Sequence, residues 1–447
     1  MYQFNMRNRL KNVSPLRMVL LFLPILFISL SPFSTLHAEQ RVINQSPRQG
    51  IAYVQGEHAN TWPSIISQAA VVMDMDTGTI VYGKNPNVKH YPASITKIMT
   101  ALLALKYGHL TDELTASKNA VDQPADKLYM VPGEKAQLQP LLYGMLLDSA
   151  NDVAVEIAEH YGGSVSHFAQ MMNQEAAALG ATHTHFVNPN GLPNPNHTTT
   201  AYDMSLIARA AMQYPEFRKI VQTKYYNWKG TAWQAKLVNL NGMLFDYPGC
   251  IGLKTGFTSV AHETLVVAAK HHGDTFLAVL MDAPTDGEIR QDATSLLNYA
   301  FAHYQTKTVV KAGQVVGHLA ADNQTTVPVV ASDAVVATVP KGKDAPTYSE
   351  NVRYALTATH LAKGSAVGKL SVYDTSGHLL ATVPVKVATS WNASSLQAQG
   401  HYWPLSIPIA IVLTLIARVL RMMLAKRRMR RRDELEPTVP FANSFES

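Results

Sequence analysis

Apolar residues recur along the middle of the chain at spacings of three and four. They do so between Ser94 and Tyr107, where Gly108 follows, and again between Leu138 and Leu146. This spacing is typical of helices that bury one face, so both segments are predicted to be buried helices. The same signal continues through residues 151–161, 166–181, 203–213 and 296–304.

Two other regions show β-rich runs with short polar turns between them. Residues 69–85 read as two strands around Asp76-Thr77-Gly78, a hairpin signal. After Gly249, residues 251–256, 263–272 and 274–282 are strand-like. We expect these runs to form one antiparallel sheet flanked by helices, an α+β fold. Residues 306–388, rich in Val, Thr, Gly and Asp, predict a second, small all-β domain.

The two ends of the chain carry targeting signals. Four basic residues precede an uncharged apolar run from Met18 to Leu30, the order of a secretory signal peptide cleaved near Ala38. The alternative is an uncleaved anchor, because Leu36 is bulky where a signal peptidase prefers a small side chain. Residues 402–424 predict a membrane helix before a basic cluster, with an amphipathic helix lying on the membrane as the rival.

These signals divide the chain into seven segments. We expect a signal peptide at 1–38, a linker at 39–60, the main domain at 61–305, the small β domain at 306–388, a linker at 389–401, the membrane helix at 402–424 and a basic, then acidic, cytoplasmic tail at 425–447. The protein would then be exported and anchored on the extracytoplasmic face of the cell membrane.

Composition excludes several classes of function. Of the net charge of +6, residues 39–417 carry −2, so the basic charge belongs to the two ends and predicts no nucleic-acid binding. The single cysteine, Cys250, allows no disulfide within the chain and is predicted to be a buried strand residue. His262-Glu263 has Val266 where a metalloprotease helix needs its second His, so no metal or other cofactor is expected.

The candidate chemistry begins with Ser94 and Lys97 in "YPASITKIMT". A spacing of three places both side chains on one face of a helical turn, where a neutral lysine could take the proton of the serine hydroxyl. Lowering a lysine pKa from about 10.4 to 7 costs about 4.6 kcal/mol, which burial and a second cation could supply. Taken alone, the pair is more often a helix cap with a solvent-facing lysine.

Two further triplets favour catalysis. Ser149-Ala-Asn151 follows the second apolar helix, and Lys254-Thr255-Gly256 opens a strand. Ser149 could relay a proton to a leaving amine, and Asn151 could bind a substrate amide. Lys254 could hold a substrate carboxylate and keep Lys97 neutral, with Thr255 bonding the same carboxylate. Gly256 would let the strand edge lie close to substrate backbone. Three motifs in this order are a strong signal of acyl transfer.

From about Ser67 to Tyr304 the chain resembles the serine D-Ala-D-Ala carboxypeptidases, the low-molecular-mass penicillin-binding proteins of peptidase family S11. The resemblance is carried by "VVMDMDTGTIVYGKN", "YPASITKIMT", "LLYGMLLDSANDVAVEIAEH", "HFVNPNGLP" and "IGLKTGFT". The chain departs from the family pattern at three positions, Ala150, Ile251 and Phe257, none of which would react.

The resemblance implies a β-lactamase/transpeptidase-like fold and an acyl-enzyme on Ser94. Lys97, Ser149, Asn151, Lys254 and Thr255 match the active-site positions of the family. It also implies an oxyanion hole made by the backbone N–H groups of Ser94 and Phe257. The substrate would be the peptidoglycan stem pentapeptide, whose terminal D-Ala is removed to limit cross-linking, and β-lactams would acylate Ser94.

Two rival functions remain. One is a class A-like β-lactamase, which relies on a glutamate for which no motif occurs between Ser149 and Lys254. The other is a catalytically idle wall-binding or β-lactam-sensing protein.

Overall fold

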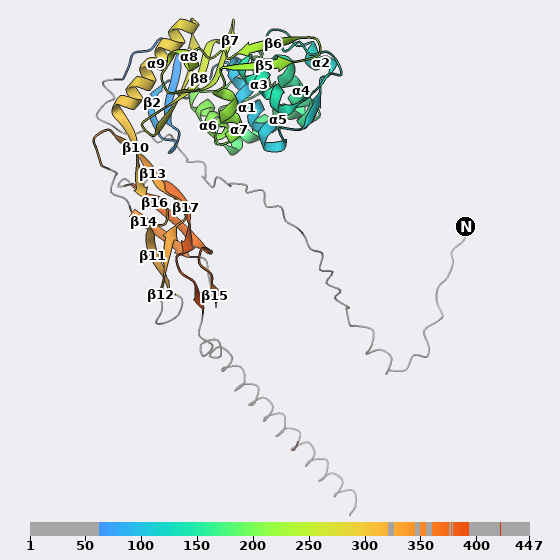
Figure 1. The fold of residues 1–447 in the computed structure, drawn as a ribbon. Helices are drawn as coiled ribbons and strands as arrows, with labels where there is room; N and C mark the ends of the chain where they lie inside the picture. The colour runs from blue at the N-terminus through green and yellow to red at the C-terminus, as the bar shows by residue number, and fades with distance from the viewer. Residues whose placement is uncertain are drawn as a thin grey trace, which may run out of the picture. The chain divides into compact units, whose positions relative to one another are not determined.

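A five-stranded antiparallel sheet (Figure 1) lies at the centre of the main domain, which ends with helix α9 (Asp286–His303). The computed structural model describes residues 62–320, 326–344, 349–354, 360–374, 377, 379–392 and 421. The sheet has the strand order β2-β1-β9-β8-β7. Its strands are β1 (Ala69–Asp74), β2 (Ile80–Lys84), β7 (Cys250–Thr258), β8 (His262–His271) and β9 (Asp274–Ala283). Both predicted strand regions are therefore confirmed.

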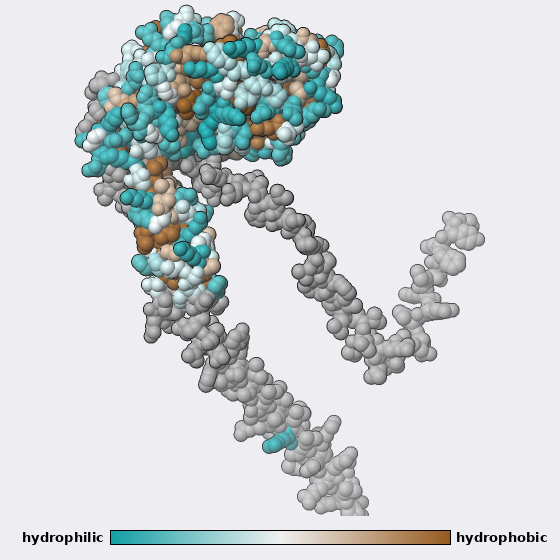
Figure 2. Space-filling model, viewed as in Figure 1, coloured by the Kyte–Doolittle hydropathy of each residue, from teal (hydrophilic) through white to brown (hydrophobic). Residues whose placement is uncertain are grey.

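Alternation along the strands creates two apolar layers. Val71 and Met73 of β1 join one core cluster with the helices of the middle of the chain, whereas Ala70 and Val72 join a second cluster with α9 (Asp286–His303). Successive side chains of a strand point to opposite faces, so helices cover both faces of the sheet. Figure 2 accordingly shows a mostly hydrophilic outer face on this part of the chain.

The remaining elements of the main domain supply the helical layer and two small two-stranded sheets. The helical elements are the 3-10 helix η2 (Ala93–Thr96), α1 (Lys97–Tyr107), α2 (Lys118–Val121), α3 (Leu138–Leu147), α4 (Asn151–Gly162), α5 (Val165–Ala178), α6 (Ala201–Ala211), α7 (Pro215–Val221) and α8 (Met243–Asp246). One two-stranded sheet pairs β3 (Glu113–Thr115) with β4 (Lys135–Gln137) across a connection that contains α2, and the other is the hairpin of β5 (Tyr225–Lys229) and β6 (Gln234–Val238).

The described chain from Tyr304 to Asn392 is all β, as expected. Its strands are β10 (Tyr304–Val310), β11 (Val315–Ala320), β12 (Thr326–Ala331), β13 (Val335–Pro340), β14 (Ser349–Tyr354), β15 (His360–Leu361), β16 (Ala366–Tyr373), β17 (Leu379–Val387) and β18 (Trp391–Asn392). Five of them form the sheet β11-β12-β17-β16-β14. A separate, valine-rich cluster between Val309 and Val387 forms its core.

Several details differ from the sequence predictions. The helix expected to begin at Ser94 is split, with Ser94 in the 3-10 turn and the α-helix beginning at Lys97. The closing helix is longer than residues 296–304, because Thr285 caps it by accepting a hydrogen bond from the backbone N–H of Glu288. The hairpin β5–β6 was not predicted.

The terminal predictions lie outside the described residues. The signal peptide at 1–38, the linker at 39–60, the linker at 389–401 except residues 389–392, and the segments at 402–424 and 425–447 apart from Arg421 are not described. Within the described residues, no helix combines the length and apolarity that crossing a membrane requires.

Glu156 is a buried carboxyl group on α4. Its side chain is 1% exposed, and neither carboxyl oxygen has a hydrogen-bond partner among the described residues. Burial, followed by the charges of Asp152 and Glu134, raises the pKa of Glu156 to about 8. Glu156 is therefore protonated near neutral pH.

This raised pKa predicts a pH-dependent stability. The native state holds the Glu156 proton up to about pH 8, whereas the unfolded chain releases it near pH 4.5. The contribution of this group to stability is therefore complete below pH 4.5 and is lost as the pH rises toward 8. We expect Glu156→Gln to reduce the fall in Tm between pH 5 and 8, measured by differential scanning calorimetry. Glu216→Gln on α7 should keep the wild-type fall; equal falls in all three proteins would contradict this assignment.

Candidate active site

Ser94 and Lys97 are joined by a direct hydrogen bond. The 3-10 turn before α1 presents Ser94, and Lys97 is the first residue of the α-helix. Lys97 Nζ lies 2.9 Å from Ser94 Oγ, and the lysine side chain is fully buried. The alternative interpretation of this pair, a helix cap with a solvent-facing lysine, is therefore wrong.

Two carbonyl oxygens complete the surroundings of the Lys97 amine. Nζ lies 2.8 Å from Asn151 Oδ1 and 2.7 Å from the backbone oxygen of Asn190. The Asn151 amide is oriented by Pro124, whose backbone oxygen accepts a hydrogen bond from Asn151 Nδ2 at 2.9 Å. Since Pro124 offers only an acceptor there, Oδ1 must face Lys97.

This arrangement directs the lone pair of a neutral Lys97. A neutral amine has two N–H bonds and one lone pair, and the two carbonyl oxygens can only accept hydrogen bonds. They occupy both N–H bonds, so the lone pair points at the Ser94 hydroxyl, the only one of the three partners with a proton to give. The geometry can therefore perform general-base activation of a serine.

The surroundings also favour the neutral amine. Burial, followed by the positive charge of Lys254, lowers the pKa of Lys97 well below its ordinary value, while Asp126 and Asp152 oppose the shift. Burial likewise lowers the pKa of Lys254 to about 8, whereas the negative charges of Asp126 and Asp148 oppose this shift. Near pH 7, Lys254 is then largely charged, and burial together with this charge favours the neutral form of Lys97.

The second motif, Ser149 to Asn151, lies where α3 ends and α4 begins. Ser149 is 3% exposed and has a φ of 65°, in the left-handed region that non-glycine residues rarely adopt. The backbone N–H of Asn151 donates to the oxygen of Asp126 at 2.8 Å, which ties the motif to the loop after α2. Backbone strain of this kind is typical of functional sites.

The third motif lies on β7, an edge strand of the central sheet. Lys254 Nζ lies 2.9 Å from the backbone oxygen of Thr255. The Thr255 side chain is half-buried, and Phe257 is 61% exposed. The structure thus joins Ser94, Lys97 and Asn151 by hydrogen bonds and places Lys254 close enough to change the pKa of Lys97.

Gly256 permits a close approach of β7 to the 3-10 turn that carries Ser94. A Cβ at this position would lie 2.6 Å from the backbone nitrogen of Ser94 and 2.7 Å from Thr264 Oγ1. The Thr264 hydroxyl lies within hydrogen-bond distance of the oxygens of both Pro92 and Gly256. Gly256 is therefore required for β7 to pack against the turn that presents Ser94, a reason that the sequence did not reveal.

Sequence reasoning missed the contribution of "NPNGLPNPNH". Its turn supplies the Asn190 oxygen to Lys97, and Gly191, at φ 86°, has no room for a Cβ, which would lie 1.9 Å from the Ala93 oxygen. His197 accepts the Val187 N–H at Nδ1 and therefore donates from Nε2 to Thr96. Turn-forming residues are visible in the sequence, but their position under the serine turn is not.

Other ionisable side chains lie elsewhere or have structural roles. Arg290 is paired with Asp246 and Asp286 at 2.7 and 2.9 Å. Burial raises the pKa of the Cys250 thiol to about 11, which keeps it protonated. His262 bonds Asp282, and no group of three or more possible metal ligands occurs among the described residues.

Asp152 lies beside the second motif and is buried. Its carboxylate accepts the Leu128 N–H at 3.1 Å and so fixes the loop that precedes Met130. Asp152 is therefore structural, and it is not solvated.

Comparisons with known proteins agree with this geometry. Residues 56–285 match the family model described as D-alanyl-D-alanine carboxypeptidase, and residues 304–392 match penicillin-binding protein 5, C-terminal domain. The chain is 32% identical over 328 residues to D-alanyl-D-alanine carboxypeptidase DacF of Bacillus subtilis, covering 71% of this chain and 84% of the relative. It is 31% identical to DacA of Haemophilus influenzae, covering 73% and 86%.

A solved structure is similar over both halves of the described chain. Penicillin binding protein 5 from Haemophilus influenzae has 30% sequence identity and a TM-score of 0.61, covering 74% of this chain and 98% of that chain.

The lysine pair predicts the pH dependence of Ser94 acylation. Acylation should rise as Lys97 loses its proton and fall again near pH 8, where Lys254 loses its charge. Lys254→Ala removes the cation that lowers the Lys97 pKa, so the acid limb should move to higher pH. Stopped-flow labelling with a fluorescent penicillin measures both limbs. An acid limb that stays in place in Lys254→Ala would show that burial alone keeps Lys97 neutral.

Gly256→Ala tests the packing of β7 against the serine turn. Overpacking of this kind costs about 1–3 kcal/mol, and the displaced turn should slow acylation by about tenfold or more. Gly287→Ala is the matched control, since a Cβ added there would meet only Thr285 Oγ1, at 4.0 Å. Acylation by Gly256→Ala at the wild-type rate would show that the turn tolerates the methyl group.

Proposed function

The chain belongs to the D-alanyl-D-alanine carboxypeptidase family, peptidase family S11, and from this premise we propose that Ser94 is its nucleophile and Lys97 its general base. The family makes the protein a serine-type hydrolase that removes the terminal D-Ala from peptidoglycan stem peptides and binds penicillin. One observation carries the assignment of the residues. Lys97 is fully buried and contacts Ser94 Oγ together with two carbonyl oxygens that accept both N–H bonds of the neutral amine.

In the acylation step, Ser94 Oγ attacks the carbonyl carbon between the two D-Ala residues. The C–N bond breaks, an ester forms, and Lys97 holds the serine proton. The leaving D-Ala amine needs a proton, and Ser149 relays it from Lys97. Water then hydrolyses the ester and returns the serine to its starting state.

The other residues of the three motifs bind the substrate. Lys254 and Thr255 hold its terminal carboxylate, and the backbone N–H groups of Ser94 and Phe257 stabilise the oxyanion. The Asn151 amide already bonds Lys97 and Pro124, so its main contribution is to orient the base, with one N–H left for a substrate carbonyl.

The cellular location is part of the proposal. The N-terminal signal-like segment supports export, and residues 402–424 followed by a basic cluster support attachment to the membrane from the extracytoplasmic side. A β-rich second half suits a spacer between a membrane segment and the enzyme. Fractionation of cells that express the full chain tests this; recovery of all protein in the cytoplasm would reject it.

Release of D-Ala from diacetyl-Lys-D-Ala-D-Ala tests the assignment of the residues. Ser94→Ala and Lys97→Ala should each lower kcat by at least about 10³-fold, because serine and base act as a unit. Ser295→Ala, in α9, is the matched control. Substantial residual release by Ser94→Ala would place the nucleophile elsewhere.

Penicillin distinguishes this activity from the β-lactamase alternative. The proposed enzyme should form a long-lived acyl-enzyme whose mass increases by that of one penicillin, seen by intact-protein mass spectrometry. Rapid turnover of penicillin by the wild type would support a β-lactamase. Peptide binding without any D-Ala release would support the idle wall-binding protein.

A further inference from the structure

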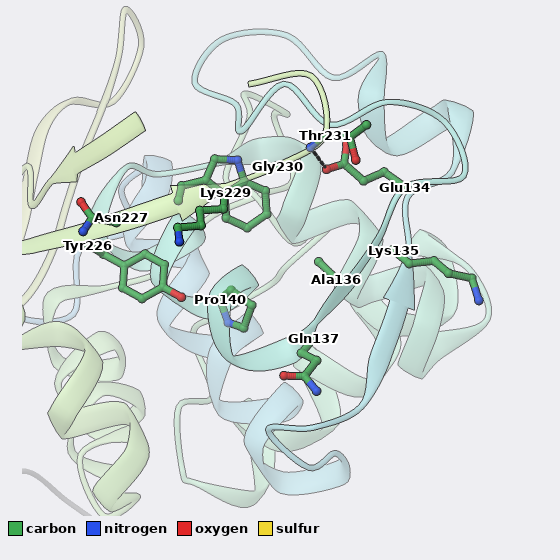
Figure 3. Close-up of a pocket in the computed structure, with 11 residues that line it drawn as sticks. Glu134, Lys135, Ala136, Gln137, Pro140, Tyr226, Asn227, Lys229, Gly230 and Thr231 are labelled. Atoms are coloured by element: carbon green, nitrogen blue, oxygen red, sulfur yellow. Dashed lines mark hydrogen bonds between the residues drawn. The ribbon is translucent and has the colours of Figure 1, made fainter. Parts of the chain in front are cut away.

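A hollow of about 400 Å3 lies apart from the three catalytic motifs, between the β3–β4 sheet and the β5–β6 hairpin (Figure 3). Residues 134–137 line one side, residues 226–231 line the other, and Pro140 of α3 lies between them. The backbone N–H of Thr231 donates to Glu134 at 2.6 Å and joins the two sides at one end (Figure 3). We call this hollow the edge groove.

The edge groove follows the free edges of two strands. Neighbouring residues of a strand point to opposite faces, so a hollow lined by consecutive residues must run along the edge of that strand. This holds for residues 135–137 of β4 and for residues 226–229 of β5. Each strand belongs to a two-stranded sheet, so each has one edge without a strand partner.

The strand pairing shows which backbone groups face the groove. Gly230 donates its N–H to Trp233 across the β5–β6 pair. Because inward and outward residues alternate along an antiparallel strand, the backbone N–H and C=O of Asn227 and Lys229 point outward. On β4, Glu134 accepts a hydrogen bond from the N–H of Ala116, and Leu138 donates its N–H to the oxygen of Asp112, so the backbone of both residues faces the β3 side. By the same alternation, the backbone groups of residues 135 and 137 point outward.

The charge of the groove favours an anionic occupant. The charged residues that line the groove are Lys135, Lys229 and one acid, Glu134, whose carboxyl oxygens accept the backbone N–H groups of Thr231 and Val131. The hairpin segment 224–238 has three lysines and no Asp or Glu. Lys135 is paired with Glu113, whereas Lys229 has no ion-pair partner in the part of the chain that the structure describes. Lys229 is thus the ammonium free to meet a carboxylate at this edge.

The groove lies within reach of the catalytic site. Helix α3 (Leu138–Leu147) contains Pro140, at the groove, and ends two residues before Ser149. The seven residues of helical rise from Pro140 to Leu147 correspond to about 10.5 Å. An extended stem pentapeptide spans about 17 Å, so two stems of one polymer can occupy both places.

We propose that the edge groove is an accessory site that binds a second stem peptide of peptidoglycan while the first occupies the catalytic site. The inference rests on the proposed function and names polymeric peptidoglycan as the preferred substrate. The peptide adds as a short strand to β5, its carbonyl and N–H groups bonding the outward backbone of Asn227 and Lys229, and its carboxylate bonding the Lys229 ammonium. On each strand, two of the outward residues line the groove, which suits a peptide of about four residues.

Titration with the stem tripeptide L-Ala-γ-D-Glu-L-Lys tests the proposal, because this probe lacks D-Ala-D-Ala. Asn227→Pro removes one outward N–H without touching the bonds to β6, and Lys229→Gln removes the charge. Each should weaken tripeptide binding by calorimetry, and retention on purified sacculi, by about five- to tenfold. Lys236→Gln, which faces Asn227 across the ribbon on β6 and does not line the groove, should stay within about twofold of wild type.

Turnover of diacetyl-Lys-D-Ala-D-Ala distinguishes failure of the accessory site from failure of the proposed carboxypeptidase function. All three variants should release D-Ala at the wild-type rate, which also shows that they are folded. No tripeptide binding by the wild type, or equal weakening in Lys236→Gln, would overturn the accessory site. A wild type that binds tripeptide through Asn227 and Lys229 but releases no D-Ala would reject the proposed function and keep the accessory site.

Discussion

The hydrogen bonds of one buried lysine place the strictest demand on this protein. Lys97 must lose a proton inside the fold and then direct its lone pair at Ser94. Burial and Lys254 favour the neutral amine, and the carbonyl oxygens of Asn151 and Asn190 orient it. Because these partners come from four separate segments, the site exists only when sheet, helices and turns are assembled together.

The scaffold meets this demand through close backbone packing. The serine turn lies between β7 and the turn around Asn190, and both contacts depend on glycine. At Gly256 and at Gly191 a Cβ would lie within 2.6 Å of the backbone around Ser94. Packing this tight keeps the reacting groups in one geometry, since a displacement of about 1 Å can cost 10²-fold in rate.

The active site and the edge groove are both built on a strand edge that has no strand partner. β7 is the edge of the central sheet and carries Lys254 and Thr255, while β4 and β5 present free edges about one helix length away. A strand edge offers regularly spaced donors and acceptors that suit a peptide substrate. The hairpin β5–β6 extends this recognition beyond the reacting bond.

The sequence by itself determined the α+β class, the central strands, the buried helices and the three motifs, because periodicity and motif spacing are local properties. It also indicated Lys254 as the cation beside Lys97. Only the tertiary structure decided that Lys97 is buried, that Asn190 and His197 support the serine turn, and that Asp152 and Glu156 are enclosed. The hydrogen bonds that carry these features join residues 22 to 101 positions apart, and no local pattern encodes which distant side chain or carbonyl oxygen will face a given group.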